Sequence, residues 1–165
     1  MTFQPRLARV DYRDVFCADL QWAPRDAEAF LRRFRASSPP WAHSLSRLRD
    51  LLVRPFRLHK SERASGETEP MPLEVNGRLG PFVVLGVTPH EVLVGDDDRH
   101  LRFRFLCSLD DSGTSVSLTT EVEYRNLFGR LYFAVVKPFH CLIVKRTLAN
   151  AALRSPAVSQ QASRR

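Results

Sequence analysis

The stretch Gly129-Arg-Leu-Tyr-Phe-Ala-Val-Val-Lys-Pro-Phe-His-Cys-Leu-Ile-Val-Lys-Arg146 decides the fold of this chain. It is almost entirely apolar, but Lys137, Pro138 and His140 interrupt it. A helix that spans a membrane needs about 20 mostly apolar residues, and the interrupted stretch is too short for that. The pattern favours a buried helix of a soluble protein that runs to about Leu153. Pro138 should kink it, because proline removes one helical hydrogen bond.

One face of this helix is expected to lie against a sheet. At 100° per residue, its apolar and aromatic side chains gather on one side. His140 lies at the border of that face, where an imidazole could act as an acid or base near neutral pH. The simpler interpretation is a histidine at the edge of the core, bonded to a carbonyl or a carboxylate. The face comprises Tyr132, Val136, Phe139 and Ile143, with Val135 and Leu142 beside it.

The composition is that of one folded domain. The 165 residues are 44% hydrophobic and carry a net charge of +7. A basic chain can bind nucleic acid, an anionic membrane or an acidic ligand, and net charge does not choose among them. Three cysteines, Cys17, Cys107 and Cys141, stand in apolar stretches, which predicts buried free thiols in the reducing cytoplasm. The first residues contain no apolar segment typical of a secretion signal.

The first part of the chain predicts one strand followed by two short helices. Asp14–Leu20 is the strand, with Val15, Cys17 and Asp19 on one face. Pro24 suits the first turn of a helix that ends near Ala36. Ser38 and Pro39 then cap and begin a second helix, which Pro55 ends. Its apolar stripe consists of Trp41, Leu45, Leu48 and Leu52.

An antiparallel meander follows a polar loop. The loop, Ser61–Pro72, is either a surface connection or the rim of a pocket. From Gly80 the hydrophobic period changes to two, and short turns such as Asp110–Gly113 join the strands. The expected strands are Phe82–Val87, Glu91–Gly95, Arg99–Leu109 and Thr114–Arg125.

The last two strands show which side faces the core, because alternate residues share a face. The outer face would place Arg102 and Arg104 opposite Glu121 and Glu123. Cross-strand ion pairs are expected there, each contributing about 0.2–1 kcal/mol. The expected inner residues are Leu101, Phe103, Phe105 and Cys107 on one strand, and Val116, Leu118, Thr120, Val122 and Tyr124 on the other.

This order of elements resembles the helix-grip architecture of START and Bet v 1-like domains, in which a curved antiparallel sheet wraps around a long C-terminal helix. The chain is also similar to the DUF2867 family from about Asp11 to Leu153. The motifs that carry this similarity are Ser37-Ser-Pro-Pro-Trp41, Leu48-Arg-Asp-Leu-Leu-Val-Arg-Pro-Phe56, Gly95-Asp-Asp-Asp-Arg-His-Leu101, Gly129-Arg-Leu-Tyr132 and Pro138-Phe-His140.

The resemblance implies an α+β, START-like domain of the SRPBCC superfamily, and no general activity is assigned to the family. Residues 1–153 would form this single domain. Residues 154–165 have lost the apolar pattern and are expected to be a disordered basic tail. Some family members carry the domain behind an NAD(P)-binding Rossmann domain. This chain has no GxGxxG motif, so no nicotinamide or other cofactor is expected.

A sheet that grips a helix leaves room for a mostly apolar pocket with a few polar groups. The candidate catalytic residues are His140, Tyr132 and Tyr124. The candidate ligand-binding residues are Trp41, Phe103, Phe105, Thr120, Val136, Phe139 and Ile143. Asp97, Asp98 and His100 are a second choice, which a charged strand entry would equally explain. No metal is expected, since successive strand residues point to opposite faces and cannot converge on an ion.

Three functions remain open from the sequence. The first is a pocket for an apolar or polycyclic small molecule in a cofactor-independent cyclase, dehydratase or isomerase. The second is a carrier or sensor with the same pocket and no turnover. The third is a basic nucleic-acid or membrane-surface binder, against which the Arg/Glu alternation of the outer face argues. Nucleic acid is therefore not the expected partner, and no oligomer is indicated. The third function would use Arg32, Arg33, Arg35, Arg47, Arg49 and Arg54.

Overall fold

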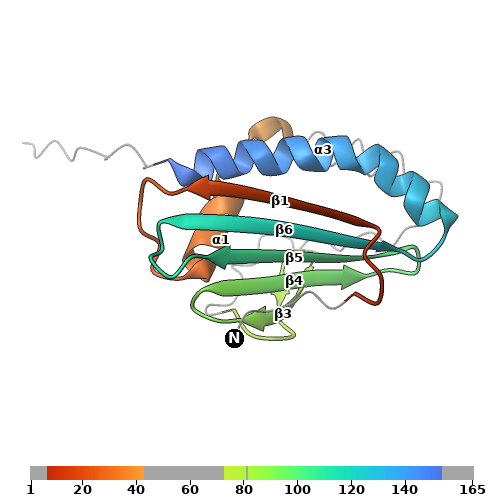
Figure 1. Ribbon diagram of the computed structural model, residues 1–165, viewed down its shortest axis with the longest axis horizontal. Helices are drawn as coiled ribbons and strands as arrows, with labels where there is room; N and C mark the ends of the chain where they lie inside the picture. The colour runs from red at the N-terminus through yellow and green to blue at the C-terminus, as the bar shows by residue number, and fades with distance from the viewer. Residues whose placement is uncertain (1–6, 43–72, 81, 154–165) are drawn as a thin grey trace, which may run out of the picture.

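The computed structural model describes residues 7–42, 73–80 and 82–153. These residues form an α+β fold in which a curved six-stranded antiparallel sheet packs against helices α1 and α3 (Figure 1). The elements are β1 (Tyr12–Asp19), α1 (Ala27–Ala36), β2 (Arg78–Leu79), β3 (Phe82–Val87), β4 (Glu91–Asp97), β5 (Leu101–Leu109), β6 (Ser115–Tyr124) and α3 (Leu127–Ala152).

Some expectations concern residues outside this description. They are the rest of the second helix with Leu45, Leu48, Leu52 and Pro55, the loop Ser61–Pro72, the tail 154–165, and the arginines Arg47, Arg49 and Arg54. Of the second helix the structure describes only its first turn, residues 40–42.

The strand order is β1-β6-β5-β4-β3-β2, and all neighbours are antiparallel. The predicted meander is confirmed as β3 to β6, joined in sequence order. The predicted first strand pairs with the last one, with Asp14 opposite Thr120. This pairing makes β1 an edge strand that runs beside α3 (Figure 1). The two-residue strand β2 was not predicted.

The predicted inner and outer faces of β5 and β6 are confirmed. Arg102 lies opposite Glu123, and Arg104 lies opposite Glu121. Only the first of these two expected ion pairs forms, because Asp97 at the end of β4 is opposite Arg102 and also binds Arg104. The ion pairs of this face are Arg102–Glu123 at 3.6 Å, Arg102–Asp97 at 3.4 Å, Arg104–Asp97, and Arg13–Glu121 at 3.6 Å.

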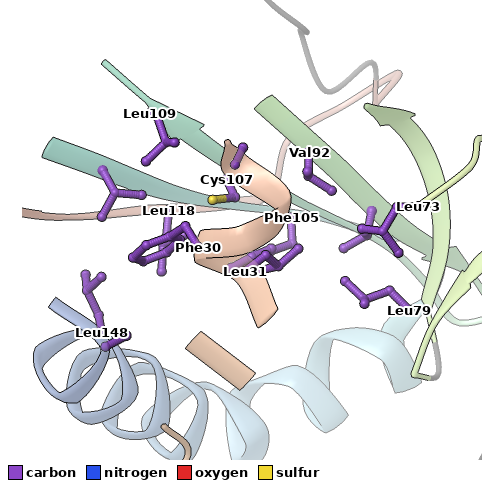
Figure 2. Packing of buried hydrophobic residues seen from close by; sticks show 14 of the residues in the cluster. Phe30, Leu31, Leu73, Leu79, Val92, Phe105, Cys107, Leu109, Leu118 and Leu148 are labelled. Atoms are coloured by element: carbon purple, nitrogen blue, oxygen red, sulfur yellow. The ribbon is translucent and has the colours of Figure 1, made fainter. Parts of the chain in front are cut away.

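Helix α1 supplies the centre of the core. It begins three residues later than Pro24 suggested, because Asp26 is the N-cap and accepts a hydrogen bond from the Ala29 amide at 2.7 Å. Phe30 and Leu31 point from α1 into the inner face of the sheet (Figure 2). Around them pack Leu73, Leu79, Val92, Phe105, Cys107, Leu109, Leu118 and, from α3, Leu148.

Helix α3 is continuous through Pro138, but its buried face is not the one predicted. Val135 and Leu142 are 50% and 46% exposed. The prediction failed because the helix is apolar almost all round, so its sequence pattern does not mark one face. The residues that α3 buries are Gly129, Phe133, Val144, Thr147, Leu148, Ala151 and Ala152, whereas Tyr132, Val136, Phe139 and Ile143 are only partly buried.

The start of α3 is held against the start of β5. The Asn126 side chain caps the helix by accepting a hydrogen bond from the Gly129 amide at 2.9 Å. The Arg125 amide donates to the His100 carbonyl at 2.9 Å. A Cβ atom at Gly129 would lie only 2.0 Å from that same carbonyl oxygen. Only glycine fits this approach between two backbones.

We expect Gly129→Ala to destabilise the fold by about 2–4 kcal/mol, because the obstructing atom is backbone and cannot rotate away. Urea unfolding followed by circular dichroism measures this loss. The control is Gly113→Ala, where no atom lies within 4 Å of the new methyl group and only the φ of +67° is unfavourable, at a cost on the order of 1 kcal/mol. Equal stability of the two variants would contradict the close approach.

Candidate functional site

Five polar side chains meet between the edge strand β1 and helix α3. Tyr12 and Asp14 project from the inner face of β1, because they alternate with exposed Arg13 and Val15. Their partners come from the facing elements. We call this group the acid–base cluster, and it consists of Tyr12, Asp14, Thr120, His140 and Cys141.

One carboxylate oxygen of Asp14 organises the cluster. Its Oδ2 atom accepts a hydrogen bond from the Tyr12 hydroxyl at 2.6 Å and lies 3.2 Å from His140 Nε2. Thr120 Oγ1 is 3.2 Å from the same imidazole nitrogen. Cys141 Sγ is 3.8 Å from Asp14 Oδ2 and 3.4 Å from the Tyr12 hydroxyl. The carboxylate therefore links β1 to two consecutive residues of α3.

The second carboxylate oxygen has no such partner. Asp14 Oδ1 is buried and makes no hydrogen bond. The Asp14 and His140 side chains are only 11% and 15% exposed. Most buried polar atoms are hydrogen bonded, so a lone buried acceptor is notable in a carboxylate that already has other partners. It is a position that a donor group of a ligand could satisfy.

The surroundings keep Asp14 ionised. Burial by itself would raise the pKa of this carboxyl, but the hydrogen bonds from His140 and Tyr12 outweigh burial and lower its pKa. Burial, followed by the hydrogen bond to Asp14, raises the pKa of Tyr12 far above its usual range. Tyr12 is therefore a neutral donor at physiological pH, and Asp14 an anionic acceptor.

The same partners define the tautomer of His140. Because Asp14 Oδ2 is an acceptor, it assigns the imidazole proton to Nε2. The other ring nitrogen, Nδ1, bonds to no group among the described residues. It remains free to take up a proton. A carboxylate that orients a histidine and stabilises its protonated form is the arrangement that makes an imidazole an effective base.

A surface depression of about 160 Å³ lies further along β1 and α3, and none of its lining residues belongs to the cluster. Phe16 lies two residues beyond Asp14 on the inner face of β1, and Lys145 lies one helical turn beyond Cys141. Since drug-sized ligands usually occupy about 300–1,000 Å³, this space suits a smaller molecule. The lining residues are Phe16, Cys17, Ala18, Lys145, Leu148 and Ala149.

The structure brings two of the predicted site residues, His140 and Thr120, into hydrogen-bonding contact. The two predicted tyrosines lie elsewhere. The Tyr124 ring packs 5.8 Å from that of Phe133, and the Tyr132 ring stacks 6.5 Å from that of Phe128.

The predicted ligand-binding residues do not converge on the cluster. Phe103 stacks on Phe82, and Phe105 packs on Phe34 of α1, both within or against the core. Trp41 is 38% exposed, at the end of the first described segment. Val136, Phe139 and Ile143 are half-buried residues of α3.

The second-choice residues have local structural partners. The Asp98 carboxylate accepts a hydrogen bond from the Arg99 amide, and Asp97 pairs with the two arginines of β5. The His100 ring contacts the side chains of Arg99 and Asn126. Among the described residues, no group of three or more His, Cys, Asp and Glu side chains gathers as metal ligands would.

Sequence reasoning missed Tyr12, Asp14 and Cys141. The predicted strand began at Asp14, and only its opposite face was considered. An ionisable residue on the inner face of a strand was the available signal, since buried carboxylates are rare without a partner. The sequence alone did not show which face of this edge strand turns inward.

Comparison with known proteins gives one result at the level of the family. The family model described as "Protein of unknown function (DUF2867)" matches residues 6–147. The match covers most of the chain and all five residues of the acid–base cluster. It confirms the family that the sequence motifs resemble. No curated protein matches the chain.

Asp14→Asn should destabilise the chain by about 1.5–3 kcal/mol at pH 7, because it replaces charge-assisted hydrogen bonds by neutral ones. The folded-state pKa of Asp14 is lowered. Its stabilising effect is therefore complete above the unfolded pKa of about 3.9 and is lost as the pH falls from there through the folded pKa.

Urea unfolding of both proteins at pH 7, 5 and 3 measures this difference. It should shrink only at the lowest pH. Asp19→Asn, at the exposed end of the same strand, is the matched control and should change little. A difference between Asp14→Asn and the parent chain that is constant with pH would contradict the role given to the ionised carboxylate.

Proposed function

Because the chain belongs to the DUF2867 family, whose description names no activity, we propose its function from the acid–base cluster. The protein is a helix-grip, START/Bet v 1-like, small-molecule protein that catalyses a proton transfer without a cofactor. His140 is the base, Asp14 holds and stabilises it, and the depression between β1 and α3 receives the substrate. The curved sheet and the long C-terminal helix are compatible with that fold.

The observation that carries this proposal is the 3.2 Å contact between Asp14 Oδ2 and His140 Nε2 in a nearly buried site. With the proton on Nε2, the Nδ1 lone pair can accept a proton from a substrate carbon or hydroxyl. The imidazolium that forms lies beside an anion, in surroundings where water screens their attraction less than in bulk. Returning the proton to another atom of the substrate completes an isomerisation, with no net gain or loss of atoms.

The charges around the depression favour a substrate with an anionic group. Lys145 Nζ lies 5.5 Å from the Phe16 ring centre, and Lys137 Nζ lies 4.8 Å from the Tyr12 ring centre. Two ammonium groups thus stand on the β1 side of α3, one beside the cluster and one beside the depression. Phe16, Leu148 and Ala149 supply the apolar wall. A small carbonyl compound with a carboxylate satisfies both features.

The size of the described depression limits how large its ligand can be, compared with the ligand expected from the sequence. A volume of about 160 Å³ corresponds to roughly five water molecules at their liquid volume. A polycyclic molecule is larger than this space. For this depression, a compact substrate is therefore favoured over the polycyclic ligand.

The test is hydrogen–deuterium exchange at the carbon next to a carbonyl. Small keto acids such as 2-oxobutanoate and levulinate are incubated with the protein in heavy water and followed by NMR. His140→Ala should slow enzyme-dependent exchange by about 10²–10⁴-fold, the usual contribution of a general base. The matched control, His90→Ala, removes an exposed histidine from the β3–β4 turn and should retain the exchange.

Binding and catalysis are separated in the same experiment. Chemical-shift changes at Phe16, Lys145 and Leu148 report that the keto acid occupies the depression. Binding there without exchange by the parent chain would instead identify a carrier or sensor. If no small keto acid perturbs these residues, the proposed site is wrong.

A further inference from the structure

Independently of the acid–base cluster, we propose that the outward face of α3 docks on the surface of an anionic lipid bilayer. The docking stripe is a row of exposed apolar side chains along this helix. Leu127 is 70% exposed and Leu131 is 60% exposed, and both belong to the stripe. The full stripe consists of Leu127, Leu131, Ala134, Val135, Pro138 and Leu142.

The stripe follows from the spacing of its residues. Successive members are separated by one, three or four positions, which keeps them on one side of a helix. That side is opposite the face through which Phe133, Val144 and Leu148 enter the core. From Leu127 to Leu142 the stripe is about 22 Å long at 1.5 Å per residue. A continuous exposed apolar surface of this kind marks a site of association.

The helix lies on the bilayer in this proposal and does not cross it. By length and composition alone α3 could span a membrane, since its mean hydropathy reaches 1.5 over an 18-residue window. Helix α3 has 26 residues and is longer than the stretch Gly129–Arg146, which was predicted to be too short to span a membrane. Its C-terminal half, however, is fixed in the domain. Trp22 Nε1 and Arg33 Nε donate to the Ala151 carbonyl at 2.8 and 3.0 Å, and Ala151 is fully buried.

The positive charge of the C-terminal part of the sequence favours an anionic bilayer as the partner. After Glu123 the sequence contains no acidic residue, whereas eight basic residues follow: Arg125, Arg130, Lys137, Lys145, Arg146, Arg154, Arg164 and Arg165. Of these, Arg130 and Arg146 are exposed on α3 on either side of the stripe, whereas the ammonium groups of Lys137 and Lys145 lie over aromatic rings of β1.

A second copy of the chain is a poorer partner for the stripe. Two such helices placed face to face would bring basic side chains together with no carboxylate of either helix between them. Anionic headgroups neutralise the same side chains while the acyl boundary takes up the leucines and valine. Exposed apolar side chains and basic residues beside them are two features that favour association with an anionic membrane surface.

Vesicle co-sedimentation tests the proposal with the full chain. Vesicles of phosphatidylcholine alone are compared with vesicles of equal parts phosphatidylcholine and phosphatidylglycerol. The protein should sediment with the mixed vesicles, and added salt should weaken this binding. Leu131→Glu should lower the fraction bound by about tenfold or more, because it places a charge in the apolar stripe.

Two further variants separate the stripe from general effects. Val75→Glu makes the same kind of change at an apolar residue that is 54% exposed outside α3, and it should bind vesicles like the parent chain. The double variant Arg130→Gln/Arg146→Gln should lose the preference for the anionic vesicles. The melting curve of Leu131→Glu should match that of the parent, since the leucine is mostly exposed.

Three results would overturn the proposal. One is absence of binding to the mixed vesicles. Another is equal binding to neutral and anionic vesicles, which would remove the role of charge. The third is a dimer, detected by light scattering, that Leu131→Glu dissociates while neither protein binds vesicles. That outcome would assign the stripe to a second copy of the chain.

Discussion

The pairing of β1 with β6 is the constraint on which the rest of the structure depends. It joins the first strand to the last and sets Asp14 opposite Thr120. Because α3 follows β6 after two residues, the same pairing brings β1 beside helix α3. Asp14 and Cys141 are 127 positions apart in the sequence and yet in contact. A slip of one residue in this register would turn Tyr12 and Asp14 to the outer face and abolish the cluster.

Most of the sheet could be predicted from the sequence, because the alternation of apolar and polar residues within a strand is a local pattern. Strands β3 to β6 alternate apolar and polar side chains between short turns, and the inner residues of β5 and β6 follow directly from that period. The outward face of α3 could not be predicted, because a helix that is apolar all round has no periodic signal. The inward direction of Asp14 depends on a partner strand about a hundred residues later, which no local pattern specifies. The competing carboxylate of Asp97 likewise reaches Arg104 only through the register of β4 and β5.

In the acid–base cluster, the Asp14 carboxylate is both buried and ionised, two conditions that usually conflict. A buried carboxylate costs free energy unless donors satisfy it, and Tyr12 and His140 do so for one oxygen of Asp14. The same two bonds keep the carboxylate ionised and orient the imidazole. Stability and the proposed chemistry therefore both depend on one atom, Oδ2. Asp14 lies on β1, the edge strand of the sheet, and faces α3.

The joining of the first strand to the last also has a consequence for biosynthesis. While the ribosome is still making the chain, β1 has left the exit tunnel long before its partner exists. The sheet can lengthen from β3 to β6 as each hairpin emerges, but its final edge must wait for residues 115–124, and the cluster for residue 141. Contacts so distant in sequence form slowly. The nascent strand β1 therefore remains a potential client for chaperones until β6 and the first half of α3 have been made.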